Sequence, residues 1–482
     1  MRDVVVAVGH TAVAKVLMLV VQFAATTILA RNLSAADYGI VGFANGIMAL
    51  LIRVNSLGLS SAVIRSPRLD QRTISTSATL NTILSVVAFV CAQLAAPLAG
   101  RLLNNQTAVI VVRVLALRLL LSPIVFLSDC VLSRELRFGE LRMGAVAGVM
   151  VRGVVSVTLA VTGFKYWSLV IGALADLLVG NTIIRMLRPV KFRYALDRAE
   201  ASRLLAFGAP LTAAGLLAFT VTNADNFVIG SMMGATILGY YTLAFTWATY
   251  GASAMQDVVQ LVLYPKFARM QQEPARVKEA YLRVLRLVTW AAGLLNIGLL
   301  VVARGFLVTW LGNGTTRWLP AASTLQVLCI YGIVRASVET AVNPVLAFGR
   351  SSLLLRAQGL AAAVELLLLP LVTARFGIQG VAVLVTVAYT LQYAVYMPFL
   401  RARLGVSAGD LLTVFGPVAV ASIVGAGLAW SMPGSNPAER WPMVIQLALV
   451  FVGFVTTHEL LTRGHVLSEC RAIVGVMLQP RP

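Results

Sequence analysis

The chain has 482 residues, of which 59% are hydrophobic and only 12% are charged, and its mean hydropathy is +0.85. These values exclude a soluble globular protein, in which about 25% of residues are charged. The net charge of +20 would favour nucleic acid as a partner of a soluble protein, but in a membrane protein it reflects which loops face the cytoplasm. We therefore expect an integral membrane protein that binds no nucleic acid.

Apolar runs long enough to cross a bilayer recur along the whole chain, separated by short loops. A helix of about 18 or more apolar residues bridges roughly 30 Å of hydrocarbon. The pattern predicts an all-α integral membrane protein with about fourteen transmembrane helices and no separate soluble domain. The expected spans are residues 9–30, 38–64, 77–99, 108–131, 143–163, 166–187, 207–230, 236–264, 284–303, 321–348, 353–374, 377–399, 411–431 and 442–462.

The basic residues are distributed unevenly between the two sides of the expected membrane. When span ends are counted with their loops, 26 of the 39 Lys and Arg lie in the N-terminus, every second loop and the C-terminal tail, whereas 7 lie in the alternate loops. Loops rich in Lys and Arg stay on the cytoplasmic side. The distribution predicts cytoplasmic N- and C-termini and an even number of spans.

Two stretches about 200 residues apart have parallel layouts. Gly39 aligns with Gly239 at a junction of two expected spans, and Phe164 aligns with Phe376 after a later span. Two parallel repeats of this kind are typical of alternating-access transporters, whose binding site lies between the lobes. The expected division is a first six-helix lobe at 1–200, a second six-helix lobe at 201–403, and a C-terminal helix pair with its tail at 404–482.

Four segments resemble a known family of transporters. They read "RNLSAADYGIVGFANGI" at 31–47, "NSLGLSSAVIR" at 55–65, "NADNFVIGSMMGATILGYYTLAF" at 223–245 and "VVQLVLYPKFARM" at 258–270. Together they look like the polysaccharide transporter branch of the multidrug/oligosaccharidyl-lipid/polysaccharide exporter superfamily, and the resemblance covers nearly the whole chain. Members of this branch typically have fourteen helices, whereas the drug-exporting relatives usually have twelve.

The resemblance implies a Wzx-like flippase. Such a protein moves undecaprenyl-diphosphate-linked oligosaccharide units across the bacterial inner membrane for exopolysaccharide, capsule or O-antigen synthesis. It contacts membrane lipids. Whether it also binds a polysaccharide polymerase or export complex is not decided by the sequence. No cofactor or metal is expected, because the four cysteines form no CxxC pair and the chain has only three histidines.

Twelve charged residues lie inside the expected spans. A charged side chain at the bilayer centre costs about 2.5–3.5 kcal/mol on insertion scales, so exposure of all twelve to lipid would cost roughly 30 kcal/mol or more. This exceeds the stability of most proteins, and we expect most of the twelve to face a hydrated interior. They are Lys15, Arg53, Arg113, Arg118, Asp129, Arg152, Asp176, Asp225, Asp257, Arg335, Glu339 and Glu365.

The two predicted lobes carry opposite interior charges. The first has five bases and two acids, a balance of +3, and the second has one base and four acids, a balance of −3. A cationic interior suits an anionic headgroup, and the planar guanidinium group of Arg forms bidentate hydrogen bonds with phosphate. The first lobe is therefore predicted to bind the diphosphate of the substrate.

Arg53 and Arg152 are the main candidates for this binding site, because each lies deep in its span without an acidic residue nearby in the sequence. Asn55, two residues after Arg53, is expected to line the same cavity and to face the phosphates or sugars of the substrate.

Three further bases are candidates with open alternatives. Arg113 and Arg118 lie about 140° apart around a helix, so they are not expected to reach the same point, and one could pair with Asp129 or Asp176. Lys15 either faces the substrate or extends to the headgroup layer.

Intramembrane acids are candidates for coupling to a proton or cation, because such groups commonly act as relays. Asp225 is the first candidate, with Asp257 and Glu365 next, although the polar run around Asp225 also fits a helix end near the periplasmic surface. Arg335 and Glu339 are spaced i, i+4, so we expect them to neutralise each other.

Two other functions compete with the flippase. A cation-coupled exporter of drugs or other small molecules is disfavoured, because it would be expected to bind cations on intramembrane acids, whereas the first lobe is cationic. A membrane glycosyltransferase or polymerase would need acids, His or Arg on a sizeable outer loop, and the loops expected outside are short. The sequence therefore predicts a transporter without catalytic residues.

Overall fold

Helices form nearly all of this protein, and the described part of the chain contains no β-strand. The chain divides into two compact units, Met1–Thr242 and Leu243–Pro482. The all-α prediction is confirmed, whereas the predicted division into lobes stays a prediction. The computed structural model describes residues 2–66, 69–270, 272–431, 440–462 and 468.

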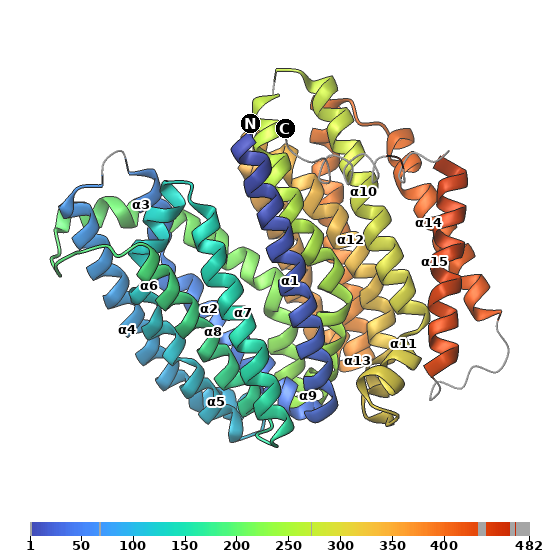
Figure 1. Cartoon of the computed structure of the whole chain (residues 1–482), viewed down its shortest axis with the longest axis horizontal. Coiled ribbons are helices and arrows are strands. Elements are labelled where there is room, and N and C mark those ends of the chain that lie inside the picture. The colour runs from blue at the N-terminus through green and yellow to red at the C-terminus, as the bar shows by residue number, and fades with distance from the viewer. Residues whose placement is uncertain (1, 67–68, 271, 432–439, 463–467, 469–482) are drawn as a thin grey trace. The chain divides into compact units, whose positions relative to one another are not determined.

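In the first unit, α4, α6, α7 and α8 run side by side (Figure 1). Helix α7 packs along α8 and α1, and α6 contacts both α4 and α8. The helices of this unit are α1 (Arg2–Asn32), α2 (Ala35–Ser56), α3 (Leu59–Arg65), α4 (Gln71–Leu102), α5 (Thr107–Leu115), α6 (Leu117–Arg134), α7 (Phe138–Val161), α8 (Trp167–Leu187) and the first part of α9 (Arg198–Arg269).

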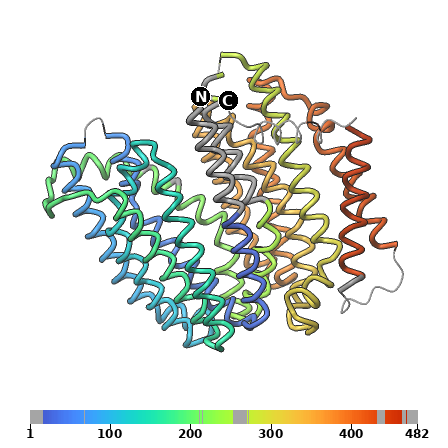
Figure 2. Tube along the Cα trace, viewed as in Figure 1, coloured from blue at the N-terminus to red at the C-terminus, as the bar shows by residue number. Residues whose placement is uncertain are grey.

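In the second unit, α12 packs against α10 and α13, and α14 packs against α15 and α10 (Figure 2). The last two helices correspond to the predicted C-terminal pair. After the end of α9, the helices are α10 (Pro274–Val301), α11 (Ala303–Gly305), a π-helical turn (Phe306–Leu311), a 3₁₀ segment (Thr316–Ala321), α12 (Ala322–Ala347), α13 (Ser351–Leu404), α14 (Ala408–Trp430) and α15 (Arg440–Thr462).

Eleven segments of the described chain are long and apolar enough to cross a membrane. Two of them, Arg198–Gly251 and Ser351–Leu404, have 54 residues each, about twice the length that a bilayer requires. Each contains a glycine with non-helical backbone angles, Gly234 or Gly377, at the positions where the sequence predicts a boundary between spans. Counting these two segments as four and adding α1 gives fourteen, as predicted.

Two helices begin with the same capping arrangement. The hydroxyl of Ser34 accepts a hydrogen bond from the backbone amide of Asp37, and the Asp37 carboxylate accepts one from the Ser34 amide. Ser407 and Asp410 repeat this arrangement at the start of α14. Each reciprocal pair satisfies amide groups that a helix start leaves unpaired, which explains why α2 and α14 begin where they do.

The aligned glycines of the repeat meet at a crossing between α2 and α9. A Cβ atom at Gly39 would lie 1.8 Å from the carbonyl oxygen of Ala235, and a Cβ at Gly239 would lie 1.7 Å from that of Ala35. The two contacts are related by exchange, because the alignment also places Ala35 on Ala235. Such reciprocal contacts are typical of a two-fold relation between similar elements, and they explain why both positions need glycine.

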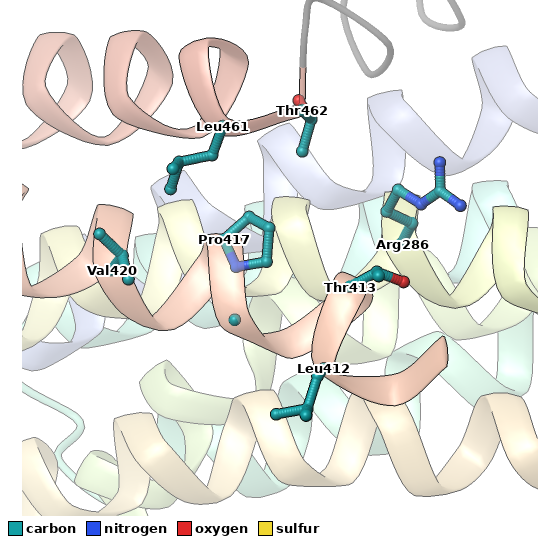
Figure 3. Close-up of a pocket in the computed structure, with 8 residues that line it drawn as sticks. Arg286, Leu412, Thr413, Pro417, Val420, Leu461 and Thr462 are labelled. Carbon is teal, nitrogen blue, oxygen red and sulfur yellow. The ribbon is translucent and has the colours of Figure 1, made fainter. Parts of the chain in front are cut away.

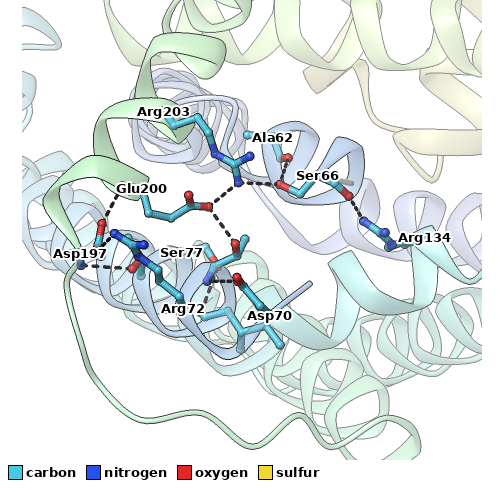
Figure 4. A network of polar contacts seen from close by, with 12 residues as sticks. Ala62, Ser66, Asp70, Arg72, Ser77, Arg134, Asp197, Glu200 and Arg203 are labelled. Carbon is cyan, nitrogen blue, oxygen red and sulfur yellow. Dashed lines mark hydrogen bonds and ion pairs between the residues drawn. The ribbon is translucent and has the colours of Figure 1, made fainter. Parts of the chain in front are cut away.

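A polar network joins the start of α9 to the turn before α4 (Figure 4). Asp197 forms an ion pair with Arg72, and the Glu200 carboxylate accepts a hydrogen bond of 2.8 Å from the Thr73 hydroxyl. Asp70 caps α4 by accepting from the Thr73 amide at 2.8 Å. Residues 188–197 before α9 form no helix, so these side chains hold an irregular segment against the first unit.

This network is expected to make the stability of the chain depend on pH in the acidic range. The backbone amide of Thr73 lowers the pKa of Asp70, and the amide of Glu200 together with Arg72 lowers the pKa of Asp197. A lowered pKa stabilises the folded chain above the unfolded value of about 3.9, and this stabilisation is lost as the pH falls through the folded value.

Replacement Asp197→Ala should therefore lower Tm by a few degrees at pH 7, and the difference from the parent chain should shrink as the pH falls below the unfolded value of about 3.9. Thermal unfolding of the detergent-purified chain at a series of pH values measures this difference. Glu279→Gln removes an exposed carboxylate of α10 and serves as the control. A Tm difference for Asp197→Ala that stays constant with pH contradicts this role.

Candidate functional site

Close packing of α7 against α8 places a set of charged residues in the first unit. A Cβ at Gly144 would lie 2.9 Å from the carbonyl oxygen of Gly180, and one at Gly148 would lie 2.3 Å from Oδ1 of Asp176. Small residues at four-residue spacing let two membrane helices approach closely. Arg152 is the next position of the same stripe on α7, so it arises on the face that contacts α8.

Arg152 is paired with an acid that lies 24 positions away in the sequence. One terminal nitrogen of its guanidinium group lies 3.8 Å from Oδ2 of Asp176, at the outer limit of an ion pair. The side chain of Arg152 remains 50% exposed and that of Asp176 is 25% exposed. Arg152 has no acidic residue nearby in the sequence, but the packing of α7 against α8 brings Asp176 beside it. The loose and exposed pair leaves guanidinium nitrogens available.

Arg118 on α6 extends this group of charges towards α2. Its guanidinium donates a hydrogen bond of 3.2 Å to the side-chain oxygen of Asn45, and it interacts electrostatically with Arg152 and Asp176. We call Asn45, Arg118, Arg152 and Asp176 the arginine cluster. Four helices contribute to it, and its formal charge is +1, because two guanidinium groups face one carboxylate. Arg118 lies within electrostatic range of Asp176, but the two do not form the ion pair that was one of the predicted alternatives.

Arg53 lies at a break in the helix that the sequence predicts to be continuous. Helix α2 ends at Ser56, and α3 starts at Leu59, because Leu57 and Gly58 have left-handed φ angles of 35° and 63°. The break fits against α9, since a Cβ at Gly208 would lie 1.8 Å from the Leu57 carbonyl oxygen.

The Arg53 side chain is exposed, and no carboxylate of the described residues forms an ion pair with it. Its guanidinium passes 3.8 Å from the position of a Cβ at Gly215 on α9. Arg53 lies eight residues from Asn45 on α2, or about 12 Å along the helix. Arg53 and Asn45, the member of the arginine cluster on α2, are therefore successive polar positions along this helix.

The other predicted substrate-binding residues occupy different environments. Asn55 is 4% exposed, and its side chain exchanges hydrogen bonds of 3.2 and 3.3 Å with the Ser85 hydroxyl of α4. It faces the packing between α2 and α4 and not an open cavity, which corrects the expectation for it. Arg113 is exposed on α5, and the structure gives it no contact with the arginine cluster. The side chain of Lys15 lies outside the described residues.

The predicted coupling residues are deeply buried where they are described. Asp225 is 3% exposed, and its carboxylate accepts hydrogen bonds from the Tyr241 hydroxyl at 2.6 Å and the Asn226 amide at 2.8 Å. The first bond spans the interruption of α9 at Gly234. Glu365 on α13 is 1% exposed, and the side chain of Asp257 lies outside the described residues.

A second buried group of polar residues lies in the second unit. The Arg335 guanidinium forms a 2.8 Å ion pair with Glu339 one turn later on α12, as the i, i+4 spacing predicts. Tyr331 and Tyr389, which pack edge to face, line this pair, and Glu365 lies within electrostatic range of Tyr389. Because Arg335 is paired within its own helix, it is a weaker candidate for binding an anion than the arginines of the first unit.

Asn45 and the partner of Arg152 were not predicted from the sequence. The signal for the partner was available as small or polar residues at four-residue spacing, Gly144, Gly148, Arg152 and Ser156 on one helix and Gly172, Asp176 and Gly180 on the next. No comparable signal marks Asn45. Among the described residues, no group of three or more His, Cys, Asp or Glu could hold a metal ion.

Comparisons with known proteins extend this description. Residues 28–323 match the sequence model of a family described as "Polysaccharide biosynthesis protein". The chain is 26% identical over 337 residues to the lipopolysaccharide biosynthesis protein WzxC of Escherichia coli (strain K12), covering 68% of this chain and 66% of WzxC. It is 24% identical over 330 residues to the succinoglycan biosynthesis transport protein ExoT of Rhizobium meliloti (strain 1021), covering 67% and 65%. The alignments thus span slightly less than two thirds of these relatives.

The fold is similar to that of a solved membrane protein. The lipid II flippase MurJ in an inward closed conformation superposes with a TM-score of 0.78, over 95% of this chain and 98% of MurJ, at 12% sequence identity. This likeness shows that the two chains share a fold.

Proposed function

Because the chain belongs to the polysaccharide biosynthesis protein family, we propose that it is a flippase for undecaprenyl-diphosphate-linked oligosaccharide. The protein would move repeat units across the bacterial inner membrane by alternating access, for exopolysaccharide, capsule or O-antigen synthesis. The observation that carries the proposal is the arginine cluster, where four membrane helices bring two guanidinium groups to one carboxylate. In the proposed orientation both termini are cytoplasmic, in line with the distribution of Lys and Arg.

In this proposal, Arg118, Arg152 and Arg53 bind the diphosphate. A phosphate that approaches the cluster competes with Asp176 for the outer nitrogens of Arg152, which the 3.8 Å pair holds only loosely. Guanidinium groups then form charge-assisted, bidentate hydrogen bonds with phosphate oxygens. Asn55 acts indirectly, because its bond to Ser85 holds the end of α2 that presents Arg53. Lys15 and Arg113 stay predictions for the same site.

Release of the headgroup follows from the same arrangement. When the diphosphate leaves, Asp176 again neutralises one of the two guanidinium groups, so the empty site is not left with two uncompensated charges close together. In the empty site the carboxylate compensates a guanidinium charge, and in the occupied site the phosphate does so. In neither state does the protein pay the full free-energy cost of unpaired buried charges. A moderate affinity suits a transporter, which must both bind and release its cargo.

Coupling to a proton or cation is a separate part of the proposal. Asp225, Asp257 and Glu365 are the candidates, and the burial of Asp225 and Glu365 supports a role for them, because buried carboxylates in membranes commonly act as relays. A coupled drug exporter would bind its cationic cargo on such acids. The net positive arginine cluster favours an anionic cargo instead.

The experiment reconstitutes the full chain in liposomes with a fluorescent undecaprenyl-diphosphate-linked oligosaccharide. A reducing agent that cannot cross the membrane then reports which leaflet the label occupies. The proposal expects label to exchange between the leaflets faster with the protein than without it, and not when a cationic dye replaces the lipid. Exchange equal to that of protein-free liposomes would refute the flippase function, and formation or cleavage of glycosidic bonds would indicate an enzyme.

A further inference from the structure

A groove in the second unit lies between the C-terminal helix pair and α10. Its volume is about 680 Å³, within the roughly 300–1,000 Å³ of small-molecule sites. Leu412 and Val420 of α14 and Leu461 of α15 form apolar walls, and Arg286 of α10 is the charged residue among the described lining residues. In Figure 3, Arg286 and Thr413 lie towards one end, and Val420 and Leu461 lie towards the other.

The position of Arg286 follows from how α10 packs against α15. Trp290 and His458 stand edge to face with ring centroids 6.4 Å apart, so these residues lie at one level. Arg286 lies one turn before Trp290 on α10, and Thr462 lies one turn after His458 on α15. Because the two helices are antiparallel, Arg286 and Thr462 again lie side by side, and both line the groove. The antiparallel helices thus place a guanidinium group directly beside a layer of packed aromatic rings.

At this end of the groove, buried polar atoms have no hydrogen-bond partner among the described residues. Nε of Arg286 is buried and has no hydrogen-bond acceptor among the described residues, and no described carboxylate forms an ion pair with this guanidinium. His458, one turn before Thr462 and behind the lining of the groove, is 0% exposed, and neither of its ring nitrogens has a hydrogen bond with a described residue, although Glu459 lies 3.8 Å from Nδ1. Buried polar groups normally have partners, so this end of the groove is suited to a ligand that supplies an acceptor.

The threonines of the groove define a second property of the ligand. The Thr413 hydroxyl donates to the carbonyl of Asp410 at 2.7 Å, and the Thr462 hydroxyl donates to that of His458 at 2.8 Å. Because each hydroxyl hydrogen is used, both oxygens are left as acceptors. Arg286 therefore provides donors for an anion, and the threonines provide acceptors for hydroxyl groups beside it.

The depth of the groove matches a lipid at the boundary between headgroups and acyl chains. Lys278, which ion-pairs with Asp410 at 2.7 Å and binds the Gly405 carbonyl, marks the polar ends of the helices. Arg286 lies two turns further along α10, or about 12 Å. An apolar groove that continues from this level along α14 and α15 would receive an acyl chain.

We propose that this groove binds an anionic phospholipid with a hydroxyl-bearing headgroup, such as phosphatidylglycerol, with its phosphate on Arg286 and an acyl chain along Leu412, Val420 and Leu461. Basic pockets between transmembrane helices recognise anionic lipid headgroups in this way. The site belongs to the second unit alone and is separate from the arginine cluster of the first. It does not depend on the proposed flippase function.

Native mass spectrometry of the detergent-purified full chain, titrated with dioleoylphosphatidylglycerol or dioleoylphosphatidylcholine, tests the proposal. We expect phosphatidylglycerol to bind about fivefold more tightly, and Arg286→Gln to remove this preference, since one basic residue near anionic lipid contributes about that factor. Arg286→Lys should retain most of it. Arg283→Gln, which removes an exposed base of the same helix, should leave the preference unchanged.

A second variant tests the groove without altering the charge. Leu461→Trp fills the apolar part and should weaken binding of both lipids at least fivefold while Arg286 is kept, so the proposal stays testable even if Arg286→Gln reduces the yield of folded protein. Equal lipid binding by Arg286→Gln and the parent chain overturns the proposal, and so does an equal loss in Arg283→Gln. If binding of undecaprenyl diphosphate depends on Arg286 while phosphatidylglycerol does not, the groove holds the lipid carrier and the proposal is wrong.

Discussion

Replacement of Arg118 or Arg152 by glutamine is expected to reduce flipping of a diphosphate-linked oligosaccharide by roughly ten- to a hundredfold. Hydrogen bonds to charged groups contribute about 1.5–3 kcal/mol each, and every 1.4 kcal/mol corresponds to a factor of ten in affinity. The double variant should be inactive. The liposome assay measures the rates, and size-exclusion chromatography with thermal unfolding shows whether each variant remains folded.

The same cluster predicts opposite effects of changing the acid and the bases. Asp176→Asn removes the carboxylate that competes with the ligand for Arg152, so headgroup binding should tighten while release slows. Arg152→Lys keeps the charge but loses the planar fork and should fall between the parent chain and Arg152→Gln. Equal losses in Asp176→Asn and Arg152→Gln would instead indicate that the pair only holds α7 against α8.

Alanine variants of Arg53 and Arg152 are compared with a variant of the exposed Arg137. Arg53→Ala and Arg152→Ala should each reduce transport by at least ten- to a hundredfold while the chain remains inserted and abundant. Arg53 is exposed beside Gly215 and has no acidic partner among the described residues. Arg137→Gln removes an exposed charge of the same unit, 46% exposed and paired with Glu135 and Glu140, and should be neutral. Normal transport by both alanine variants would contradict the assignment of the diphosphate site.

The spans could be predicted from the sequence because the bilayer imposes a simple length requirement on apolar helices. Even the interruptions of α9 and α13 at Gly234 and Gly377 coincide with predicted boundaries. The break at Leu57 and Gly58 was not predicted, since the apolar run continues through it. It depends on the contact with Gly208, which lies 150 positions away from Gly58 and leaves no local signal.

The candidate site was only partly predictable for a related reason. Hydropathy identifies which charges lie inside spans, and thus indicated Arg53, Arg118 and Arg152, but it does not give the rotation of one helix relative to another. The pairing of Arg152 with Asp176 depends on that rotation, which the glycines of α7 and α8 determine. Asn55 is close to Arg53 in the sequence but not in its surroundings. It lies two residues after Arg53 and therefore on another face of the helix, against Ser85.

Gly39→Ala and Gly239→Ala are expected to be among the most damaging small substitutions in the described part of the chain. In each case the added Cβ would lie within 2 Å of a backbone carbonyl oxygen, at 1.8 Å from Ala235 or 1.7 Å from Ala35. Backbone cannot rotate away as a flexible side chain can, so α2 and α9 must separate. Overpacking of this kind costs about 1–3 kcal/mol or more, and we expect a lower Tm together with slower flipping.

Gly427→Ala provides the matched control. Gly427 lies in α14 with no atom within 4 Å of the added Cβ, so this variant should be neutral or slightly stabilised, because alanine favours a helix over glycine by about 0.5–1 kcal/mol. A loss of stability equal to that of Gly39→Ala would show that the assay reports glycine replacement in general and not the crossing.

The double variant Gly39→Ala/Gly239→Ala distinguishes a shared crossing from two local defects. Gly39 contacts Ala235 and Gly239 contacts Ala35, and the alignment places Ala35 on Ala235. Both contacts therefore lie at the same crossing of α2 and α9. Once one alanine has separated the helices, the second meets less resistance, and the loss of stability in the double variant should be smaller than the sum of the single losses. Residues that share a backbone shift couple by about 0.5–3 kcal/mol. Additive losses of stability would mean that the two contacts respond independently, and that they do not form a single crossing of α2 and α9.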